Sequence, residues 1–188
     1  MPSGIIAIGA SWGGVRAVSV VLRDLRASLA VPVVIAQHRG EEHDTRLAET
    51  LSRHSAMPVV EAIDKAPPEP GHAYLAPPGY HLLVERGSLS LSTEGEVRFS
   101  RPSIDVLFES VADAYGEDAV GVILTGASDD GAAGLARIRR RGGVTVVQEP
   151  ATAERRTMPE AALARARAHR VLALDEIAPF LMKVCGSG

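Results

Sequence analysis

Residues 4–14 read GIIAIGASWGG, an aliphatic run that ends in a glycine-rich turn. The run Gly4–Gly9 is almost entirely apolar, which is typical of a strand buried on both faces of a parallel sheet. The next segment, Gly14–Leu25, has aliphatic residues at helical spacing and predicts a helix directly after the turn. A strand, a tight glycine turn and a helix in this order indicate a doubly wound α/β fold.

The same alternation of short aliphatic runs and amphipathic segments continues along the chain. It predicts strands at Val31–Gln37, Pro58–Ala62, Ala119–Leu124, Val144–Gln148 and Val171–Leu174, and helices at Thr45–His54, Ser103–Tyr115, Gly131–Arg141, Pro159–Ala168 and Glu176–Val184. The segment Lys65–Gly95 differs, because prolines precede a strict alternation in Ser88–Ser92. We therefore expect a mostly parallel sheet with helices on both faces and a small antiparallel hairpin insert.

The composition narrows the class of protein. A chain of 188 residues with 46% hydrophobic residues fits a single domain over residues 1–188. The net charge of −3 argues against a dedicated nucleic-acid binder, although basic clusters at residues 137–141 and 155–156 leave a specific partner open. A lone cysteine, Cys185, excludes an internal disulfide and the Cys-rich zinc sites. Without an apolar run long enough for membrane insertion, a cytoplasmic protein is expected.

The turn after the first strand has the spacing of a nucleophile elbow. In the pattern Gly9-x-Ser11-x-Gly13 the serine hydroxyl is exposed on a sharp strand-to-helix turn. The alternative is a phosphate-binding turn of a nucleotide-binding fold. That alternative is weaker, since its fingerprint requires glycine in place of Ser11 and the chain has no Walker lysine.

A serine nucleophile requires a neighbouring base, which in turn is oriented by a carboxylate. Of the six histidines, His38 comes directly after the second strand, at the same sheet edge as Ser11. Asp129 and Asp130 lie in a glycine-bounded loop after the strand Ala119–Leu124. Either aspartate fits a helix N-cap equally well, and spacing alone does not choose between them. Serine, histidine and aspartate at three strand ends nevertheless match the arrangement of a catalytic triad.

Five ordered motifs extend this pattern over essentially the whole chain. They are Ile8–Gly14, Ala36–His38, Pro70–Pro77, Arg101–Phe108, and Gly121–Gly126 followed by Asp130–Gly134. Together they closely resemble the catalytic domain of the bacterial CheB-type protein-glutamate methylesterases. The resemblance implies a serine hydrolase in which Ser11 is the nucleophile, His38 the base and Asp130, not Asp129, the carboxylate. It implies no metal and no cofactor.

The resemblance also implies a substrate. The family removes methyl groups from methylated glutamates of methyl-accepting chemoreceptor proteins, through an acyl-enzyme, and deamidates certain glutamines there. Its complete proteins usually carry an N-terminal receiver domain, so a separate receiver-domain regulator is expected for this chain. Two alternatives remain open: an esterase or deamidase acting on a non-chemotaxis protein or a small ester, and a catalytically silent signalling domain.

The surroundings of Ser11 depart from the family pattern at Trp12, where a small residue is usual, and at Gly126-Ala127-Ser128, where Gly-Met-Gly is usual. We expect backbone N–H groups near Trp12, Gly13, Ala127 and Ser128 to form the oxyanion and pocket region. The Trp12 indole is expected to form a pocket wall, or alternatively to pack against the insert. A further expectation is that Arg155 and Arg156 flank this edge and steer a glutamate-rich helix; the alternative is a solvated charge pair.

Overall fold

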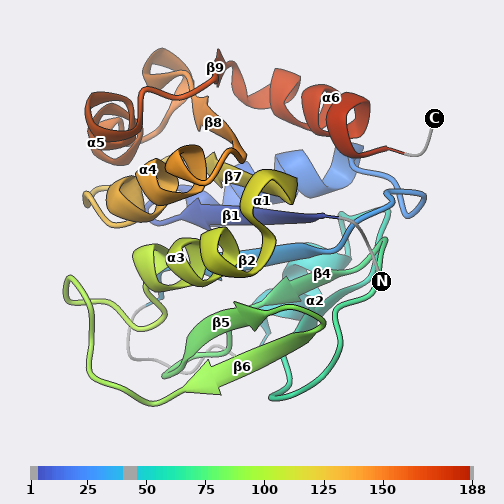
Figure 1. The fold of residues 1–188 in the computed structure, drawn as a ribbon. Helices are drawn as coiled ribbons and strands as arrows, with labels where there is room; N and C mark the ends of the chain where they lie inside the picture. Colours follow the sequence, from blue (N-terminus) through green and yellow to red (C-terminus); the bar gives the residue numbers. More distant parts are fainter. Residues whose placement is uncertain (1–3, 40–45, 187–188) are drawn as a thin grey trace.

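The computed structural model describes residues 4–39 and 46–186 (Figure 1). Within these residues one sheet of seven parallel strands has the order β3-β4-β2-β1-β7-β8-β9. Its strands are β1 (Ile5–Ala10), β2 (Val33–Gln37), β3 (Val59–Glu61), β4 (Ala73–Leu75), β7 (Ala119–Ile123), β8 (Val144–Gln148) and β9 (Arg170–Leu172). The strand order reverses beside β1, and open α/β sheets bind ligands at such a switch point.

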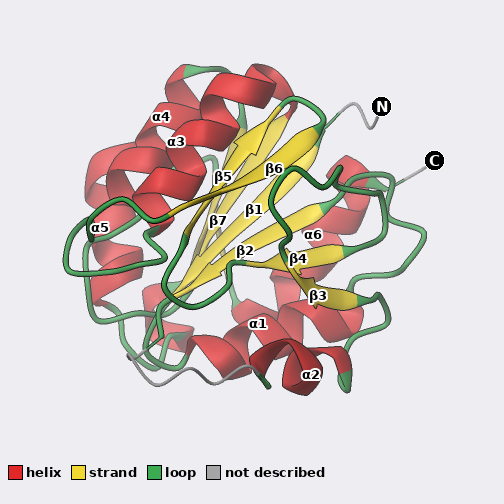
Figure 2. Ribbon diagram, turned by 90° about the horizontal axis from the view of Figure 1, so that it is seen from below, coloured by secondary structure: helices red, strands yellow, loops and turns green. Residues whose placement is uncertain are grey.

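Helices cover both faces of this sheet, as Figure 2 shows. One face carries α1 (Gly14–Asp24), α2 (Leu47–Ser52) and α6 (Leu174–Cys185), and the other carries α3 (Ile104–Tyr115), α4 (Ala132–Arg140) and α5 (Thr157–Ala166). Single 3-10 turns lie at Gly116–Asp118 and Pro150–Thr152. A separate antiparallel hairpin, β5 (His81–Glu85) and β6 (Ser88–Ser92), packs against α3. The expected fold class is confirmed.

The central strand β1 is buried along its whole length because the two helical layers enclose it. Successive side chains of a strand point to opposite faces. Ile6 and Ile8 accordingly pack with α1 and α6, whereas Ile5 and Ala7 pack with α3 and the hairpin side. Full burial of each large aliphatic side chain contributes roughly 1.5–3 kcal/mol. The end of β1, where Ser11 follows, is therefore fixed by the core.

Within the segment Lys65–Gly95, for which short antiparallel strands are expected, Ala73–Leu75 is an exception. These residues form β4, which lies between β3 and β2 in the main sheet and is parallel to both. All three side chains are buried, so the segment belongs to the core. A three-residue strand is too short to show a hydrophobic period, and the prolines around it favour a loop interpretation. The antiparallel expectation is correct for Ser88–Ser92, which is β6.

Other boundaries shift by a few residues. The fifth helix begins at Thr157 rather than Pro159, because proline is tolerated in the first turn of a helix, where its missing N–H has no partner anyway. Ser103, with which the expected helix Ser103–Tyr115 begins, is the N-cap of α3, since its hydroxyl accepts the N–H of Val106. The expected helix start at Thr45 lies outside the described residues.

Candidate active site

The carboxyl ends of β1, β2 and β7 meet at one edge of the sheet. In the parallel ladder Ala10 pairs with Gln37, so Ser11 and His38 follow the last paired residues of neighbouring strands. Neighbouring strands lie about 4.8 Å apart, which places the two residues side by side. The N–H of His38 donates to the carbonyl of Ala10 at 3.0 Å and continues the ladder to this point.

The backbone of Ser11 is held on several sides. Its N–H donates to the carbonyl of Thr125 at 3.0 Å, and its carbonyl accepts the N–H of Gly14 and the amide of Gln37, both at 2.8 Å. The turn needs glycine at residue 13, whose φ is 76° and where a Cβ would lie 2.7 Å from Oε2 of Glu154. The serine thus lies on a rigid turn, with part of its surface exposed.

His38 has one ring nitrogen fixed by a carboxylate. Its Nε2 lies 2.7 Å from Oδ2 of Asp130, while Nδ1 lies 3.4 Å from the hydroxyl of Ser100. The side chain is largely buried. An ionised Asp130 accepts hydrogen bonds only, so Nε2 carries the proton and Nδ1 is the unprotonated nitrogen, whose lone pair accepts a hydrogen bond from the hydroxyl of Ser100. The nitrogen able to accept a proton therefore faces away from Asp130.

Asp130 is fully buried and saturated with donors. The hydroxyl of Ser103 and the N–H of Asp105 donate to Oδ1 at 3.0 Å, and the N–H of Ile104 donates to Oδ2 at 2.7 Å. Burial by itself would raise the pKa of Asp130, but the hydrogen bonds from His38, Asp105 and Ile104 outweigh burial and hold it below its usual value. The carboxylate therefore stays ionised at neutral pH.

Asp129, the neighbouring candidate, lies in a different environment. Its side chain is 59% exposed and forms an ion pair with Arg98 at 2.7 Å. The same guanidinium donates through Nε to Oδ2 of Asp105 at 3.0 Å. Asp129 thus faces solvent and Arg98, whereas Asp130 faces His38.

The expected oxyanion region can be compared with the hydrogen bonds of the described residues. Among these residues no acceptor is bound by the N–H groups of Trp12 and Gly13, which precede α1. The N–H of Gly126 is already used by the carbonyl of Arg155 at 3.1 Å. The hydroxyl of Ser128 accepts the N–H of Asp130 at 3.4 Å, and Ala127 is exposed beside it. Among the described residues, the N–H groups of Trp12, Gly13, Ala127 and Ser128 bind no acceptor and are therefore available as oxyanion donors.

The side chain of Trp12 is 59% exposed and lies against the loop before α5. Its Nε1 donates to Oε1 of Glu154 at 3.1 Å, and the guanidinium of Arg155 lies 5.4 Å from its ring centre. Arg155 is anchored beside the turn, since its N–H donates to Oγ1 of Thr125 at 2.8 Å. Arg156 lies on the outside of the same loop, 3.9 Å from Glu160.

The family follows from a comparison with known proteins. The family model described as CheB methylesterase matches residues 6–181. The chain belongs to the CheB methylesterase family. The protein-glutamate methylesterase/protein-glutamine glutaminase 3 of Pseudomonas aeruginosa is 44% identical over 96% of this chain and 54% of its own length. The protein-glutamate methylesterase FrzG of Myxococcus xanthus is 40% identical over 97% of this chain and 55% of its own length.

This CheB-family chain therefore spans about half the length of those two relatives. A relative from Leptospira interrogans is covered almost completely: it is 42% identical over 95% of this chain and 93% of its own length. Among solved structures, the crystal structure of the Thermotoga maritima CheB methylesterase catalytic domain has a TM-score of 0.91 at 28% identity. That match covers 96% of this chain and 98% of the other. The family expected from the sequence motifs is confirmed.

Several residues around this CheB-family site were missed by the sequence reasoning. Arg98 contacts Asp129, and Ser100 contacts His38. Asp105 contacts the start of α4. Ser103 was recognised only as a helix cap, although its hydroxyl also binds Asp130. For Ser103 and Asp105 a signal was present in the motif Arg101–Phe108. Both are polar residues at the start of a helix, and a polar side chain that is buried there needs a hydrogen-bond partner elsewhere.

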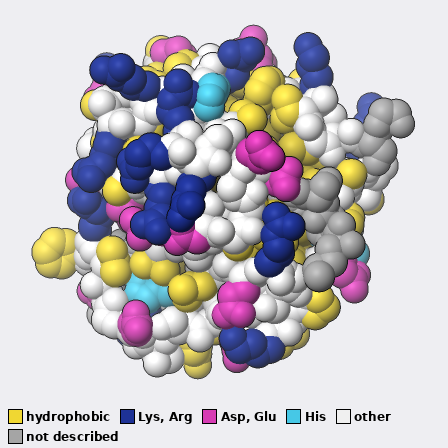
Figure 3. Space-filling model, in the orientation of Figure 1, with side chains coloured by type: hydrophobic (Ala, Val, Ile, Leu, Met, Phe, Trp, Pro, Cys, Tyr) yellow, Lys and Arg dark blue, Asp and Glu magenta, His cyan; other side chains and the backbone are white. Residues whose placement is uncertain are grey.

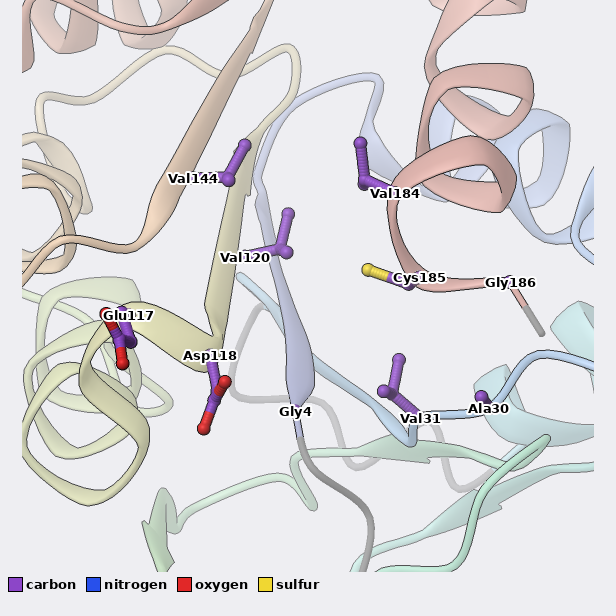
Figure 4. A pocket seen from close by; sticks show the side chains of 10 residues that line it. All are labelled: Gly4, Ala30, Val31, Glu117, Asp118, Val120, Val144, Val184, Cys185 and Gly186. Carbon is purple, nitrogen blue, oxygen red and sulfur yellow. The ribbon is translucent and has the colours of Figure 1, made fainter. Parts of the chain in front are cut away.

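Away from this edge, the CheB-family domain has a cavity of about 310 Å³ at the amino end of the sheet. Figure 4 shows Cys185 at its wall and Glu117 and Asp118 near β7. Burial raises the pKa of the Cys185 thiol to about 11, so it is protonated at neutral pH. Over residues 4–39 and 46–186, no cluster of three or more potential metal ligands is present, and no helix has the length and apolar character needed to cross a bilayer.

Proposed function

We propose that this chain hydrolyses glutamate γ-methyl esters on methyl-accepting chemoreceptor proteins and deamidates glutamines there, with Ser11 as nucleophile. One observation supports the chemistry most strongly: the buried carboxylate of Asp130 lies 2.7 Å from Nε2 of His38, at the edge where Ser11 follows β1. The names of the Pseudomonas and Myxococcus relatives support the reaction. The substrate follows from the resemblance of the motifs.

The proposed reaction begins with a proton transfer. Ser11 Oγ attacks the γ-carbonyl carbon of the ester while its proton passes to Nδ1 of His38. Asp130 stabilises the imidazolium that forms, because its carboxylate accepts Nε2–H. Compared with the common triad arrangement, the two ring nitrogens exchange roles. The N–H groups of Trp12 and Gly13 would bind the oxyanion of the tetrahedral intermediate.

Collapse of this intermediate breaks the ester bond. His38 returns the proton to the departing oxygen, which leaves as methanol, and the glutamyl group remains on Ser11 as an ester. Water then attacks with His38 as base, and the products are free Ser11 and a glutamate carboxylate. With glutamine as substrate the same steps release ammonia instead of methanol.

The test is methanol release from a methylated receptor fragment, measured beside hydrolysis of p-nitrophenyl acetate. Ser11→Ala should lower both activities by about 10⁴-fold or more, and His38→Ala should do nearly as much, because the two residues act as a unit. Circular dichroism should show an unchanged fold. Retention of about a tenth of the activity in either variant would exclude these roles. Ester hydrolysis without methanol release from receptor would exclude the substrate but not the chemistry.

A further inference from the structure

A tight turn projects from the connection between β6 and α3, at the left of the view in Figure 1. Val97 and Ser100 exchange two backbone hydrogen bonds, at 3.2 and 3.0 Å, around Arg98 and Phe99. Both central residues have positive φ, 52° for Arg98 and 58° for Phe99. This is the conformation of a type I′ turn, which favours asparagine and glycine because a larger side chain crowds its own backbone there.

An ion-pair brace holds this unfavourable turn in place. The guanidinium of Arg98 bridges Oδ2 of Asp105 at 3.0 Å and Oδ2 of Asp129 at 2.7 Å. Asp105 is buried in the first turn of α3 and also accepts the N–H of Gly134 at 2.7 Å. The turn is therefore tied to two helices of the core through Asp105. Its tip has a defined position relative to the site.

The turn presents an aromatic ring to solvent beside the candidate active site. Phe99 is 97% exposed and belongs to neither of the two core clusters. The next residue, Ser100, has its hydroxyl 3.4 Å from Nδ1 of His38. Trp12, which follows Ser11, is 59% exposed. Exposed aromatic residues are thus chain neighbours of the serine and of Ser100, the residue that contacts His38.

Exposed apolar side chains are common on protein surfaces and need no special explanation when they are scattered. Phe99 differs because a residue type unsuited to the turn is kept in a braced, positive-φ conformation next to the reacting residues. Strained backbone of this kind persists where the surrounding structure enforces it, and it clusters at functional sites. At 97% exposure the ring contributes little to the core, and its place next to Ser100, which contacts His38, favours a binding role.

We propose that Phe99 docks the protein substrate: it packs against the apolar part of an acidic helical segment that carries the methyl ester. This inference rests on the proposed function. The charge of the same edge fits such a helix, since Arg155 and Arg156 are exposed there. An aromatic ring fits between side chains that are one helical turn apart. A small ester lacks the helical segment that this ring would contact, so the ring would distinguish protein substrates from small esters.

Phe99→Asn tests this directly, because asparagine tolerates positive φ and leaves the Arg98 brace in place. We expect kcat/KM for the methylated receptor fragment to fall by about 10–30-fold, as for a typical aromatic hot spot. The ratio of receptor to p-nitrophenyl acetate turnover should fall by the same factor. The melting temperature should stay the same or rise by about 1–4 °C, since the strain is relieved. Phe99→Tyr should retain the activity of the wild type.

A matched control is Val184→Asn, which removes an exposed apolar side chain at the opposite edge of the sheet and should change neither ratio nor affinity. The binding step is measured separately in a Ser11→Ala background, where Phe99→Asn should weaken the affinity for the receptor fragment about tenfold. This readout decides on Phe99 even if the wild type releases no methanol, which would exclude the proposed function alone.

Three outcomes would overturn the docking role of Phe99. The first is an unchanged affinity and an unchanged ratio in Phe99→Asn. The second is an equal loss on receptor and small ester, which would mean that the turn only supports His38. The third is a dimer in light scattering that Phe99→Asn converts to a monomer, which would identify a second copy of this chain as the occupant.

Discussion

Asp130 joins the candidate histidine to the first turn of a helix: its carboxylate lies 2.7 Å from Nε2 of His38 and also accepts the backbone N–H groups of Ile104 and Asp105. The N-terminus of α3 thus stabilises the same negative charge that orients the imidazole. Because α3 packs against β1, β5 and α4, the orientation of His38 depends on the core as well as on its own strand.

Replacement of each of the two neighbouring aspartates by asparagine should have unequal effects on activity. Asp130→Asn should lower p-nitrophenyl acetate hydrolysis by about 10²–10⁴-fold, since a neutral amide neither stabilises the imidazolium nor accepts all the donors around it. Asp129→Asn should cost less than about tenfold, because this side chain faces solvent and Arg98. The measurement is kcat/KM with thermal stability as the control for folding. Equal losses would remove the assignment of Asp130.

The stability of the protein should depend on two buried carboxylates with opposite pKa shifts. Burial raises the pKa of Asp105 and the nearby charge of Asp130 adds to this, although the N–H of Gly134 and the guanidinium of Arg98 act against it. The pKa of Asp130 is lowered, because its hydrogen bonds from His38 and α3 outweigh burial. On acidification, Asp105 therefore takes up its proton at a higher pH in the folded protein than in the unfolded chain, and Asp130 at a lower pH.

Whether stability rises or falls with pH depends on which state, folded or unfolded, binds more protons. For Asp105 the folded state protonates first, so its contribution to stability increases as the pH falls from its folded pKa toward about 4. For Asp130 the unfolded chain protonates first, so stability is lost as the pH falls below about 4. As the pH is lowered from 7.5 to about 4.5, we expect the urea midpoint of the wild type to rise relative to that of Asp105→Asn. A constant difference would contradict the raised pKa.

The sequence located the candidate site because parallel strands bring their carboxyl ends to one edge, and Ser11 and His38 each follow such an end directly. Spacing alone could not separate Asp129 from Asp130, and only the resemblance of the motifs chose Asp130. Burial of Asp130 depends on the start of α3, where Ile104 lies 26 residues earlier in the chain. The turn at Phe99 was also missed. Nothing in the residue types at Arg98 and Phe99 indicates positive φ, because both disfavour it.

Gly126 packs closely against the candidate nucleophile. A Cβ at this position would lie 2.9 Å from Cβ of Ser11 and 2.7 Å from the sulfur of Met158. Gly126→Ala should displace the serine turn and lower turnover of receptor and small ester alike, by about 10²-fold for a shift near 1 Å. The matched control is Gly95→Ala, where a Cβ meets no neighbour within 4 Å. Unchanged turnover in Gly126→Ala would show that the turn adapts.

The arginines beside the site should affect the rate of association. Arg155→Glu with Arg156→Glu should reduce kcat/KM for the acidic receptor, most at low ionic strength, because steering is screened by salt. Hydrolysis of a neutral small ester should change less than about twofold. The double variant Arg140→Glu with Arg165→Glu makes the same charge change where Lys and Arg side chains gather over α4 and α5 (Figure 3). Equal effects of both pairs would indicate net charge rather than local steering.

The Trp12 indole has defined contacts with the loop before α5. Among the described residues it binds Glu154 through Nε1 and lies under the guanidinium of Arg155. The backbone of Trp12 is held independently, since its carbonyl accepts Oγ1–H of Thr125 at 3.0 Å. A substitution can therefore remove the indole while it leaves the N–H of residue 12 in position.

Trp12→Thr should accordingly retain turnover of p-nitrophenyl acetate and shift discrimination among larger substrates. A single apolar contact in a binding pocket is worth about 1–3 kcal/mol, so the ratio of kcat/KM for receptor and small ester should change by about 5–150-fold. Trp12→Phe keeps an aromatic face for Arg155 but loses the hydrogen bond to Glu154, and it should keep most of the ratio. If the ratio stays constant in Trp12→Thr while the melting temperature falls, the indole stabilises the loop before α5 and has no part in substrate selection.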